Sequence, residues 1–404
     1  MLGGQIEGRP AVWMGHTDAV TQFCQPGRGA ASPLYSLDDG GVIRRWDPQA
    51  GRWTKAWTTR AEAEAGQSPA ACVARGEGPA AETLWVGVGA DVWHIDPRAA
   101  AAASAASLAA LVTRRSRYAA PSDGATDVSC VAQNPAAPYQ LAVAVESGGV
   151  ALHDLRGGSA ANAAAPLADA KPRPSQPSAT FHASAMGVSA VHFAGAQRLW
   201  TAGMDSVAAV WDAATGSQVD RIDAQALVEQ SSSAASADEA SSVTPSSIVI
   251  PSVNPAFVFD LCSAAHHDAE EKADTMLALG TGHVALVAYD RHGRRTAHLS
   301  SDAANWAQTC IQPASEGAAA SYVSGALDGT VSRWTVAHAA GAAVPPQLVG
   351  RATIDRKLNA VAPLATMDDG RVVVALGGNH KYLRMVPTDP TDRLVNGAIE
   401  LRIL

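Results

Sequence analysis

The sequence has few charged residues, 17% of its 404 positions, and no apolar run long enough to span a membrane. Its first ten residues, MLGGQIEGRP, lack a basic region followed by an apolar run, and their glycines follow Leu2, so neither a secretory signal nor N-myristoylation is expected. The formal net charge of -8 argues against binding of nucleic acid by the surface as a whole. We therefore expect a cytoplasmic or nuclear protein with no nucleic-acid or membrane partner.

What the chain does have is a repeat of about 40 to 50 residues, a length typical of one four-stranded sheet per unit. Alternating, β-branched runs separated by glycine-containing or polar turns indicate antiparallel strands. Seven units align on their third strands: VIRRWD (42–47), DVWHID (91–96), VALHDL (150–155), VAAVWD (207–212), VALVAYD (284–290), TVSRWT (330–335) and YLRMVP (382–387).

These units resemble WD repeats of the WD40 family over nearly the whole chain. In that family a His after Gly, a Ser or Thr in the second strand, an Asp in the next turn and a Trp in the third strand form a hydrogen-bonded set within each blade. The resemblance implies three such sets: His16, Ser36, Asp39 and Trp46 in the first unit, His182, Thr201, Asp205 and Trp211 in the fourth, and Ser324, Asp328 and Trp334 in the sixth. The other four units lack the Trp. The fold expected is an all-β, seven-bladed WD40 β-propeller.

A closed ring of blades requires one blade built from both ends of the chain. We expect RPAVW (9–13) to be its outer strand, and LNAVAPL (358–364), RVVVALGG (371–378) and KYLRMVP (381–387) to supply the other three. Such closure removes exposed sheet edges. Residues 1–404 are then a single propeller.

Three low-complexity insertions interrupt the period and are expected to be loops between blades. Residues 99–124 are alanine-rich, with a short helix as one possibility, and end near the basic segment TRRSR (113–117). Contact of that segment with phosphate or an acidic partner is an alternative to a solvated loop. Residues 157–178 are rich in Ala and Pro, and residues 224–252 have the composition of a flexible linker.

The five cysteines include no C-x-x-C pair, and repeat alignment places all of them in the innermost strand of their units: Cys24, Cys72, Cys130, Cys262 and Cys310. We interpret them as reduced core residues that behave as small hydrophobes, with a metal or redox site as the alternative.

Three further patterns contain residue types that can carry chemistry. A run of possible metal ligands has poor spacing and is expected to be a solvated hairpin turn: His266, His267, Asp268, Glu270 and Glu271. The glycines of VGVGAD and LGTGH precede strands rather than helices, so they indicate turns and not phosphate loops. A hydrolytic triad of His16, Asp18 and Ser36 competes with the WD-repeat set for two of its members. We therefore expect no enzyme activity, no cofactor and no metal.

A more informative pattern is Asp-x-Arg at the end of a third strand, with Asp96 and Arg98 in HIDPR and Asp154 and Arg156 in LHDLR. In the WD-repeat family, a Trp-Asp-x-Arg ending marks many substrate receptors that dock on the propeller adaptor of cullin-4 ubiquitin ligases, the Arg offering a planar fork of donors. Here histidines replace the residues around the expected Trp, and Ser147 stands where the motif usually has Asp. The alternative is that each pair merely braces the next turn.

The order of complete and divergent units also resembles the family of WD repeat-containing protein 53. The likeness rests on DDGGVIRRW, AGMDSVAAVWD before a long polar insertion, NPAFVFDL (254–261) after it, and KLNAVAPL leading to LRMVP. That resemblance implies a receptor for a cullin-4 ligase. We expect a non-catalytic interaction scaffold that is monomeric within a complex. An architectural subunit of a larger assembly is the alternative. A third hypothesis is an enzyme or a ligand binder that uses the central channel.

Overall fold

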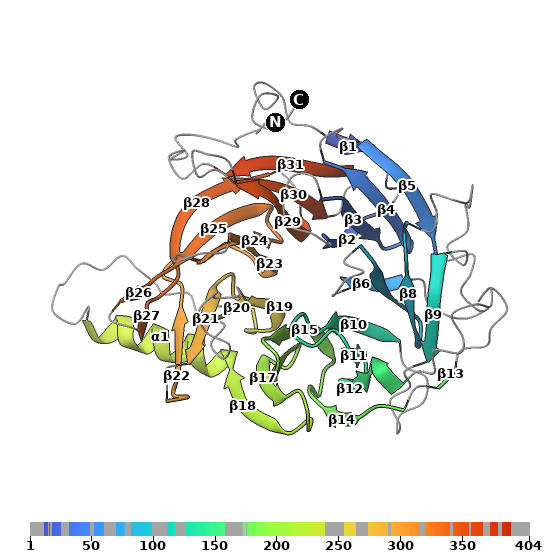
Figure 1. Cartoon of the computed structure of the whole chain (residues 1–404). Helices are drawn as coiled ribbons and strands as arrows, with labels where there is room; N and C mark the ends of the chain where they lie inside the picture. The colour runs from blue at the N-terminus through green and yellow to red at the C-terminus, as the bar shows by residue number, and fades with distance from the viewer. Residues whose placement is uncertain are drawn as a thin grey trace.

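The computed structural model describes residues 12–14, 16, 18–25, 32–48, 52–59, 70–76, 82–98, 111–117, 127–157, 173–174, 176–238, 254–263, 274–289, 292–315, 320–339, 342–354, 357–366, 372–378 and 382–388. Their strands form a β-propeller, a ring of sheets stacked around a central axis (Figure 1).

Each sheet starts at the axis with an inner strand, followed outward by a second strand. The inner strands, numbered by sheet from first to seventh, are β2 (Val20–Cys24), β6 (Ala70–Arg75), β10 (Val128–Gln133), β15 (Val188–Ala194), β19 (Val258–Ser263), β23 (Gln308–Ser315) and β29 (Leu358–Thr366). The second strands are β3 (Leu34–Asp38), β7 (Leu84–Val88), β11 (Gln140–Val145), β16 (Arg198–Gly203), β20 (Thr275–Leu279), β24 (Ala320–Ala326) and β30 (Val372–Gly378).

The third strands are β4 (Val42–Asp47), β8 (Asp91–Ile95), β12 (Gly149–Asp154), β17 (Val207–Asp212), β21 (Val284–Tyr289), β25 (Thr330–Val336) and β31 (Tyr382–Thr388), all within the segments predicted for them or one residue beyond. The outer strands are β5 (Arg52–Thr58), β9 (Val112–Arg117), β14 (Ala179–His182), β18 (Gln218–Asp223), β22 (Arg295–Leu299), β28 (Gln347–Thr353) and β1 (Val12–Met14). A separate hairpin pairs β26 (His338–Ala339) with β27 (Ala342–Ala343).

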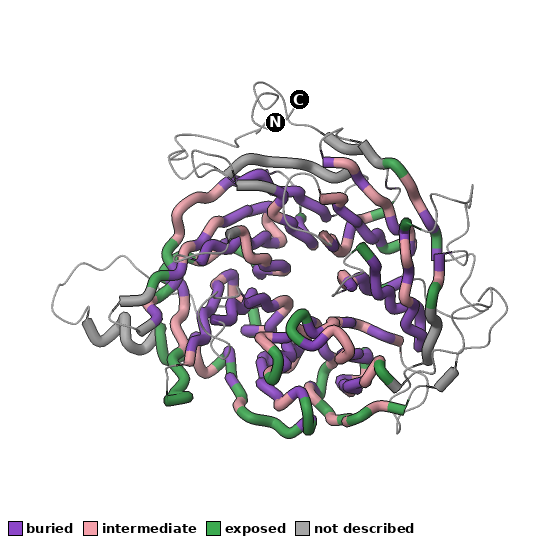
Figure 2. The backbone as a smooth tube through the Cα atoms, in the orientation of Figure 1, coloured by how far each residue is buried: buried purple, intermediate pink, exposed green. Residues whose placement is uncertain are grey.

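Burial changes along each sheet from the axis outward. Second strands such as β20 are buried at every position because the sheet is packed between two neighbours, which explains their nearly continuous apolar sequences. Outer strands such as β18 and β22 are mostly exposed or half-buried. Figure 2 shows this contrast as purple second strands and green segments at the outer edge, while the inner strands alternate between purple and pink.

The inner strands share one irregularity that marks them as repeats of a single unit. In every sheet the pairing between the inner and second strands shifts register after the first residue of the inner strand, as at Val20/Gln22 and Val188/Ala190. A bulge of this kind increases the local twist of a strand pair. Its recurrence at the same place in all seven sheets supports a single repeated unit.

Apolar side chains hold neighbouring sheets together. One buried cluster lies between each adjacent pair of sheets, including the seventh and the first, where Leu364 and Val373 pack with Leu34 and Trp46. Each inner strand contacts the next around the axis, and the series returns from β29 to β2. The ring is closed because β1 pairs antiparallel with β31, as the sequence predicted for the residues before Gly15.

The expectation of seven equivalent four-stranded blades is wrong in one sheet. Six sheets have four strands, but the second has five, because β13 (Arg173–Pro174) pairs in parallel with β9 at its outer edge. Both strands come from segments expected to be loops: β9 lies within residues 99–124, where a short helix was considered, and β13 lies within residues 157–178. The count of regular four-stranded blades among the described residues is therefore six.

The insertion at residues 224–252 also differs from the flexible linker predicted for it. Its first half is helix α1 (Ala224–Asp238), and its remainder, up to residue 252, lies outside the described residues. The Asp223 carboxylate caps the helix by accepting a hydrogen bond from the amide of Ala226 at 2.9 Å. Ala224 and Val228 are buried in the cluster between the fourth and fifth sheets. Capping and this apolar anchor explain a helix in a Ser- and Ala-rich segment.

Candidate interaction site

The first sheet contains a buried chain of four polar side chains. Trp46 Nε1 donates to Ser36 Oγ at 2.7 Å, Ser36 Oγ lies 2.5 Å from His16 Nε2, and His16 Nδ1 lies 2.7 Å from a carboxylate oxygen of Asp38. The second Asp38 oxygen accepts the amide of Val42 at 2.8 Å. Since the carboxylate only accepts, the imidazole donates from Nδ1 and accepts the Ser36 hydroxyl at Nε2. Each of the four polar side chains therefore has a hydrogen-bond partner within the set.

The acidic member of this chain is Asp38. The resemblance to WD repeats implied Asp39, so that assignment is wrong. Asp38 ends strand β3 and is fully buried, whereas Asp39 begins the turn and is exposed. Asp39 lies one residue further from Trp46 than the turn aspartates of the fourth and sixth sheets lie from theirs. Partial burial, followed by the nearby charges of Asp38 and Asp18, raises the pKa of the Asp39 carboxyl.

In the fourth sheet the same hydrogen bond joins Trp211 Nε1 to Thr201 Oγ1 at 2.9 Å. His182 is not part of the set. It ends the outer strand β14 of the third sheet and is exposed. The position that His16 occupies before its inner strand is taken here by Ser184, which is buried.

Turn aspartates in the fourth and sixth sheets bond to the backbone instead of to a histidine. Asp205 Oδ2 accepts the amide of Ala185 at 3.1 Å, and Asp328 Oδ2 accepts the amide of Asn305 at 3.3 Å. In the sixth sheet Trp334 Nε1 donates to Ser324 Oγ at 2.8 Å. The tryptophan–hydroxyl bond is therefore common to the three sheets, and the histidine is particular to the first.

Asp96 and Arg98 form a closed pair at the end of β8. Arg98 donates from its backbone amide and from Nε to Asp96 Oδ1, and from Nη2 to Oδ2, each at 2.9 Å. Half of the Arg98 side chain, 50%, remains exposed. Hydrogen bonds from the Arg98 side chain lower the pKa of the Asp96 carboxyl, and the same contact raises the pKa of Arg98.

Asp154 and Arg156 repeat this geometry at the end of β12. Arg156 Nη2 donates to Asp154 Oδ2 at 2.6 Å, and its backbone amide donates to Oδ1 at 2.9 Å. The guanidinium also lies over the Tyr139 ring, 3.8 Å from its centre, a cation–π contact that fixes its plane. The arginine is 64% exposed, and its hydrogen bonds lower the pKa of Asp154.

These two pairs occupy the same turn of adjacent sheets. The equivalent residue in the fourth sheet, Asp212, has no arginine two residues later and instead accepts the Thr215 amide and hydroxyl. Because inner and third strands are both antiparallel to the second, the ends of β8 and β12 lie on the face where the inner strands end. Arg98 and Arg156 therefore present two guanidinium groups on one face.

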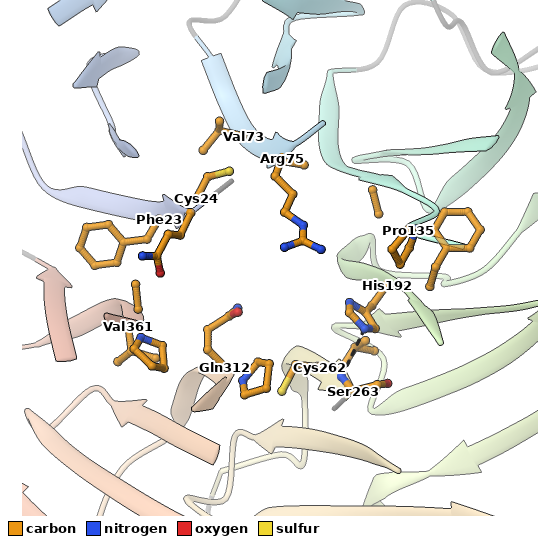
Figure 3. A pocket seen from close by; sticks show the side chains of 18 of the residues that line it. Phe23, Cys24, Val73, Arg75, Pro135, His192, Cys262, Ser263, Gln312 and Val361 are labelled. Atoms are coloured by element: carbon orange, nitrogen blue, oxygen red, sulfur yellow. Dashed lines mark hydrogen bonds between the residues drawn. The ribbon is translucent and has the colours of Figure 1, made fainter. Parts of the chain in front are cut away.

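The central channel opens into a cavity on this same face, which we call the channel chamber. It has a volume of about 450 Å³ and is lined by residues from all seven inner strands or the turns after them (Figure 3). The polar or charged lining residues are Gln25, Arg75, Gln133, His192, Ser263 and Gln312. Deeper in the channel, Asp260 is the one carboxylate among the described lining residues.

The cysteine prediction is confirmed as to place and burial: all five are free, buried and in inner strands. Burial raises the pKa of the Cys72 thiol to about 12 and raises the pKa values of Cys130 and Cys310 as well. A thiol with so high a pKa is a poor nucleophile and metal ligand.

The described residues include only some of the other candidate patterns. His16 and Ser36 are sealed in the first sheet, so a triad with Asp18 has no access to substrate. Gly89 and Gly282 have positive φ in turns between strands, as predicted for the two GxG segments. The acidic and histidine run at residues 266–271 lies outside the described residues, as do the side chains of 114–117 in strand β9. No group of metal-ligating side chains is found among the residues with assigned positions.

Comparison with known proteins adds no relative. No family model matches the chain, and no curated protein matches it either. The resemblance to WD repeats therefore rests on the propeller fold and on the three tryptophan–hydroxyl bonds.

Proposed function

We propose that the protein is a non-catalytic interaction scaffold of the seven-bladed WD40 type, with the five-stranded sheet as its second blade, and that it serves as a substrate receptor for a cullin-4 ubiquitin ligase. The observation that carries this proposal is the pair of exposed guanidinium groups at equivalent turns of the second and third sheets. A rigid ring holds such turn residues at fixed spacing, which suits recognition of another rigid protein.

The intramolecular ion pairs leave donors for a partner. A guanidinium has five N–H groups, and each arginine uses Nε and one N–H of Nη2 on its own aspartate. Three N–H groups remain on Arg98 and on Arg156. Because the aspartates already fix both side chains, little rotamer entropy is lost when an acidic surface binds them. This preorganisation favours docking over an incidental turn contact.

The test is recovery of the purified propeller adaptor of cullin-4 ligases by immobilised protein. We expect Arg98→Ala combined with Arg156→Ala to retain at least tenfold less adaptor than wild type, since each charge-assisted hydrogen bond contributes about 1.5 to 3 kcal/mol. A matched control replaces two exposed arginines at the outer edge of the ring, Arg221→Ala in β18 with Arg294→Ala just before β22, and should bind like wild type. Equal recovery by all three proteins removes the site, and recovery by none removes the role.

A second candidate is an architectural subunit of a larger assembly. One observation favours it: both arginines are already neutralised by their own aspartates, as a turn brace requires. In that case native extract fractionated by size would contain the protein only in one stable large complex that lacks cullin. A channel-binding enzyme is supported least, because Asp260 and His192 are the only described acid and imidazole among the channel-lining residues.

Cellular location and stoichiometry stay predictions: cytoplasmic or nuclear, as one propeller within a complex, without nucleic acid. None of the helices placed by the structure combines the length and apolar character of a bilayer-spanning segment.

A further inference from the structure

Two large apolar side chains are exposed at equivalent positions of the fourth and sixth sheets. Met186 is 63% exposed and Trp306 is 57% exposed, and each lies two residues before the inner strand of its sheet. Both lie on the face where the inner strands begin, which we call the start face and which is opposite to the face of Arg98 and Arg156. Met and Trp are enriched in protein–protein interfaces relative to the rest of a protein surface. These two positions are therefore candidate anchors for a partner.

The fold holds the backbone of both loops in the same way. Asp205 in the fourth sheet and Asp328 in the sixth each accept the backbone amide of the residue that precedes the exposed side chain. In the fourth sheet the amide of Met186 also donates to Ser184 Oγ at 3.2 Å. Because these bonds already fix the loops, little backbone entropy is lost when a partner binds there.

The fifth sheet lies between these two sheets around the ring. Its turn between the second and third strands contacts the loop of Trp306, because the Ala304 amide donates to the carbonyl of Gly282 at 2.9 Å. Before its inner strand, Pro255 is exposed and Phe257 is half-buried. The start face therefore carries apolar side chains in three consecutive sheets.

Carboxylates accompany these apolar side chains. Glu146, in the turn after β11, and Asp302, in the loop before β23, are exposed on the start face. Asp205 and Asp328 are half-buried there, and because a backbone amide is neutral, the bonds that they accept do not cancel their charges. These four carboxylates extend from the third to the sixth sheet, and the exposed Lys357 lies beyond them, just before β29.

We infer that the start face binds a basic segment of a partner protein, whose apolar side chains cover Trp306 and Met186 while its lysines or arginines lie beside the carboxylates. Positive charge on the partner complements this surface and steers the encounter. The same carboxylates repel phosphate groups, so the surface favours a protein segment over nucleic acid or an anionic membrane. The inference adds a second binding surface to the proposed scaffold and does not depend on Arg98 or Arg156.

Selection of a random library of short peptides on the immobilised full chain tests this inference without a known partner. We expect the peptides enriched on wild type to combine Lys or Arg with apolar residues. The same selection on the full chain with Met186→Ser and Trp306→Ser should not enrich them. The inference is overturned if only acidic peptides are enriched, or if no peptide prefers wild type to this variant.

Fluorescence anisotropy of one selected peptide, synthesised with a dye, then measures the contribution of the apolar anchors. Met186→Ser with Trp306→Ser should weaken binding by about tenfold or more, since a few buried apolar anchors dominate the affinity of such interfaces. The matched control is Val219→Ser, which replaces another exposed apolar side chain, 55% exposed, on the outer strand β18 and should bind like wild type.

A second pair of substitutions tests the charges without touching the apolar side chains. Glu146→Gln with Asp302→Asn should weaken binding by about fivefold or more at low salt, while Glu229→Gln on helix α1 should not change it. Peptide binding that withstands either pair of substitutions overturns the inference. Arg98→Ala with Arg156→Ala should bind the peptide like wild type, so failure of this inference is distinguishable from failure of the ligase proposal.

Discussion

Two carboxylates inside the ring of sheets illustrate different ways of accommodating an acidic side chain in a propeller. Asp38, in the first sheet, is fully buried beside the His16 imidazole and also accepts a backbone amide. Asp260, in the inner strand of the fifth sheet, accepts hydrogen bonds from the amides of Ile311 and Leu261, and no side-chain donor reaches it among the described residues.

The difference appears in the ionisation of Asp260. Its side chain is half-buried because it borders the channel, yet protein surrounds it, and this desolvation raises the pKa of its carboxyl to about 7. The two backbone hydrogen bonds lower the pKa by less than desolvation raises it. The two amides therefore do not offset the desolvation of the Asp260 carboxylate.

The largest expected effect comes from removing the partner of Asp38. His16→Ala leaves that carboxylate buried with one backbone donor, and we expect the free energy of unfolding to fall by about 3 to 5 kcal/mol. His182→Ala, which the sequence placed in an equivalent role, should change it by no more than about 0.5 kcal/mol because that histidine is exposed. Urea midpoints of the two variants measure the contrast. Equal losses would show that the assignment of the histidine to the first sheet alone is wrong.

The next effect concerns Asp260 and depends on pH. Because its folded pKa is raised above the usual 3.8, its contribution to stability is fully present below about pH 4 and is lost as the pH rises through about 7. Three pKa units correspond to about 4 kcal/mol, and channel water reduces this to about 2 kcal/mol. Asp260→Asn keeps an acceptor for the Ile311 amide and should not show this loss.

Unfolding of wild type and Asp260→Asn from pH 4 to pH 8 isolates that carboxyl. Asp96, Asp154 and Asp212 have lowered pKa values and act in the opposite direction, but they do so equally in both proteins. The wild type should lose stability relative to the variant as the pH rises. A constant difference across the range contradicts the assignment.

The smaller test compares adjacent residues. Asp38→Asn replaces one carboxylate oxygen with an NH2 group, which then faces another donor, either His16 Nδ1 or the Val42 amide. We therefore expect the free energy of unfolding to fall by about 1 to 3 kcal/mol. Asp39→Asn removes a negative charge from a carboxyl whose pKa is raised by partial desolvation and by the charges of Asp38 and Asp18. The free energy of unfolding at pH 7 should therefore stay within about 0.5 kcal/mol of the wild-type value or increase slightly. Thermal unfolding of the pair decides which aspartate completes the set, and a reversed order would restore Asp39.

Much of the fold was predictable because strands and turns recur at a fixed period. The third strands, the closing strand and the tryptophan–hydroxyl pairs all depend on local alternation and a constant spacing of ten residues between the hydroxyl and the indole. The strand β9, VTRRSR, was not predictable, because it lies within an alanine-rich segment and its partner β8 is not apparent from the local sequence. Helix α1 depends on burial of Ala224 and Val228 against two sheets, which the local composition does not reveal.

The candidate site was predictable only in part. The Asp-x-Arg spacing located Arg98 and Arg156, but the sequence does not show that each arginine folds back onto its own aspartate. His182 and Asp39 were misplaced because a residue type alone does not fix a position: Ser184, and not His182, stands where His16 stands before its inner strand, and Asp39 is the first residue of its turn whereas Asp205 and Asp328 are the second. The channel chamber had no sequence signal, because Arg75, His192 and Gln312 belong to three different units.

The pairing of β1 with β31 has a consequence for how the protein is made. Residues 12–14 leave the ribosome about 370 residues before their partner strand at residues 382–388. Until residues 382–388 have been synthesised, β1 has no partner strand, and an unpaired strand is a site where strands of other molecules can add. Strand β1 must therefore pair quickly once β31 has been synthesised, or be shielded by other molecules until then.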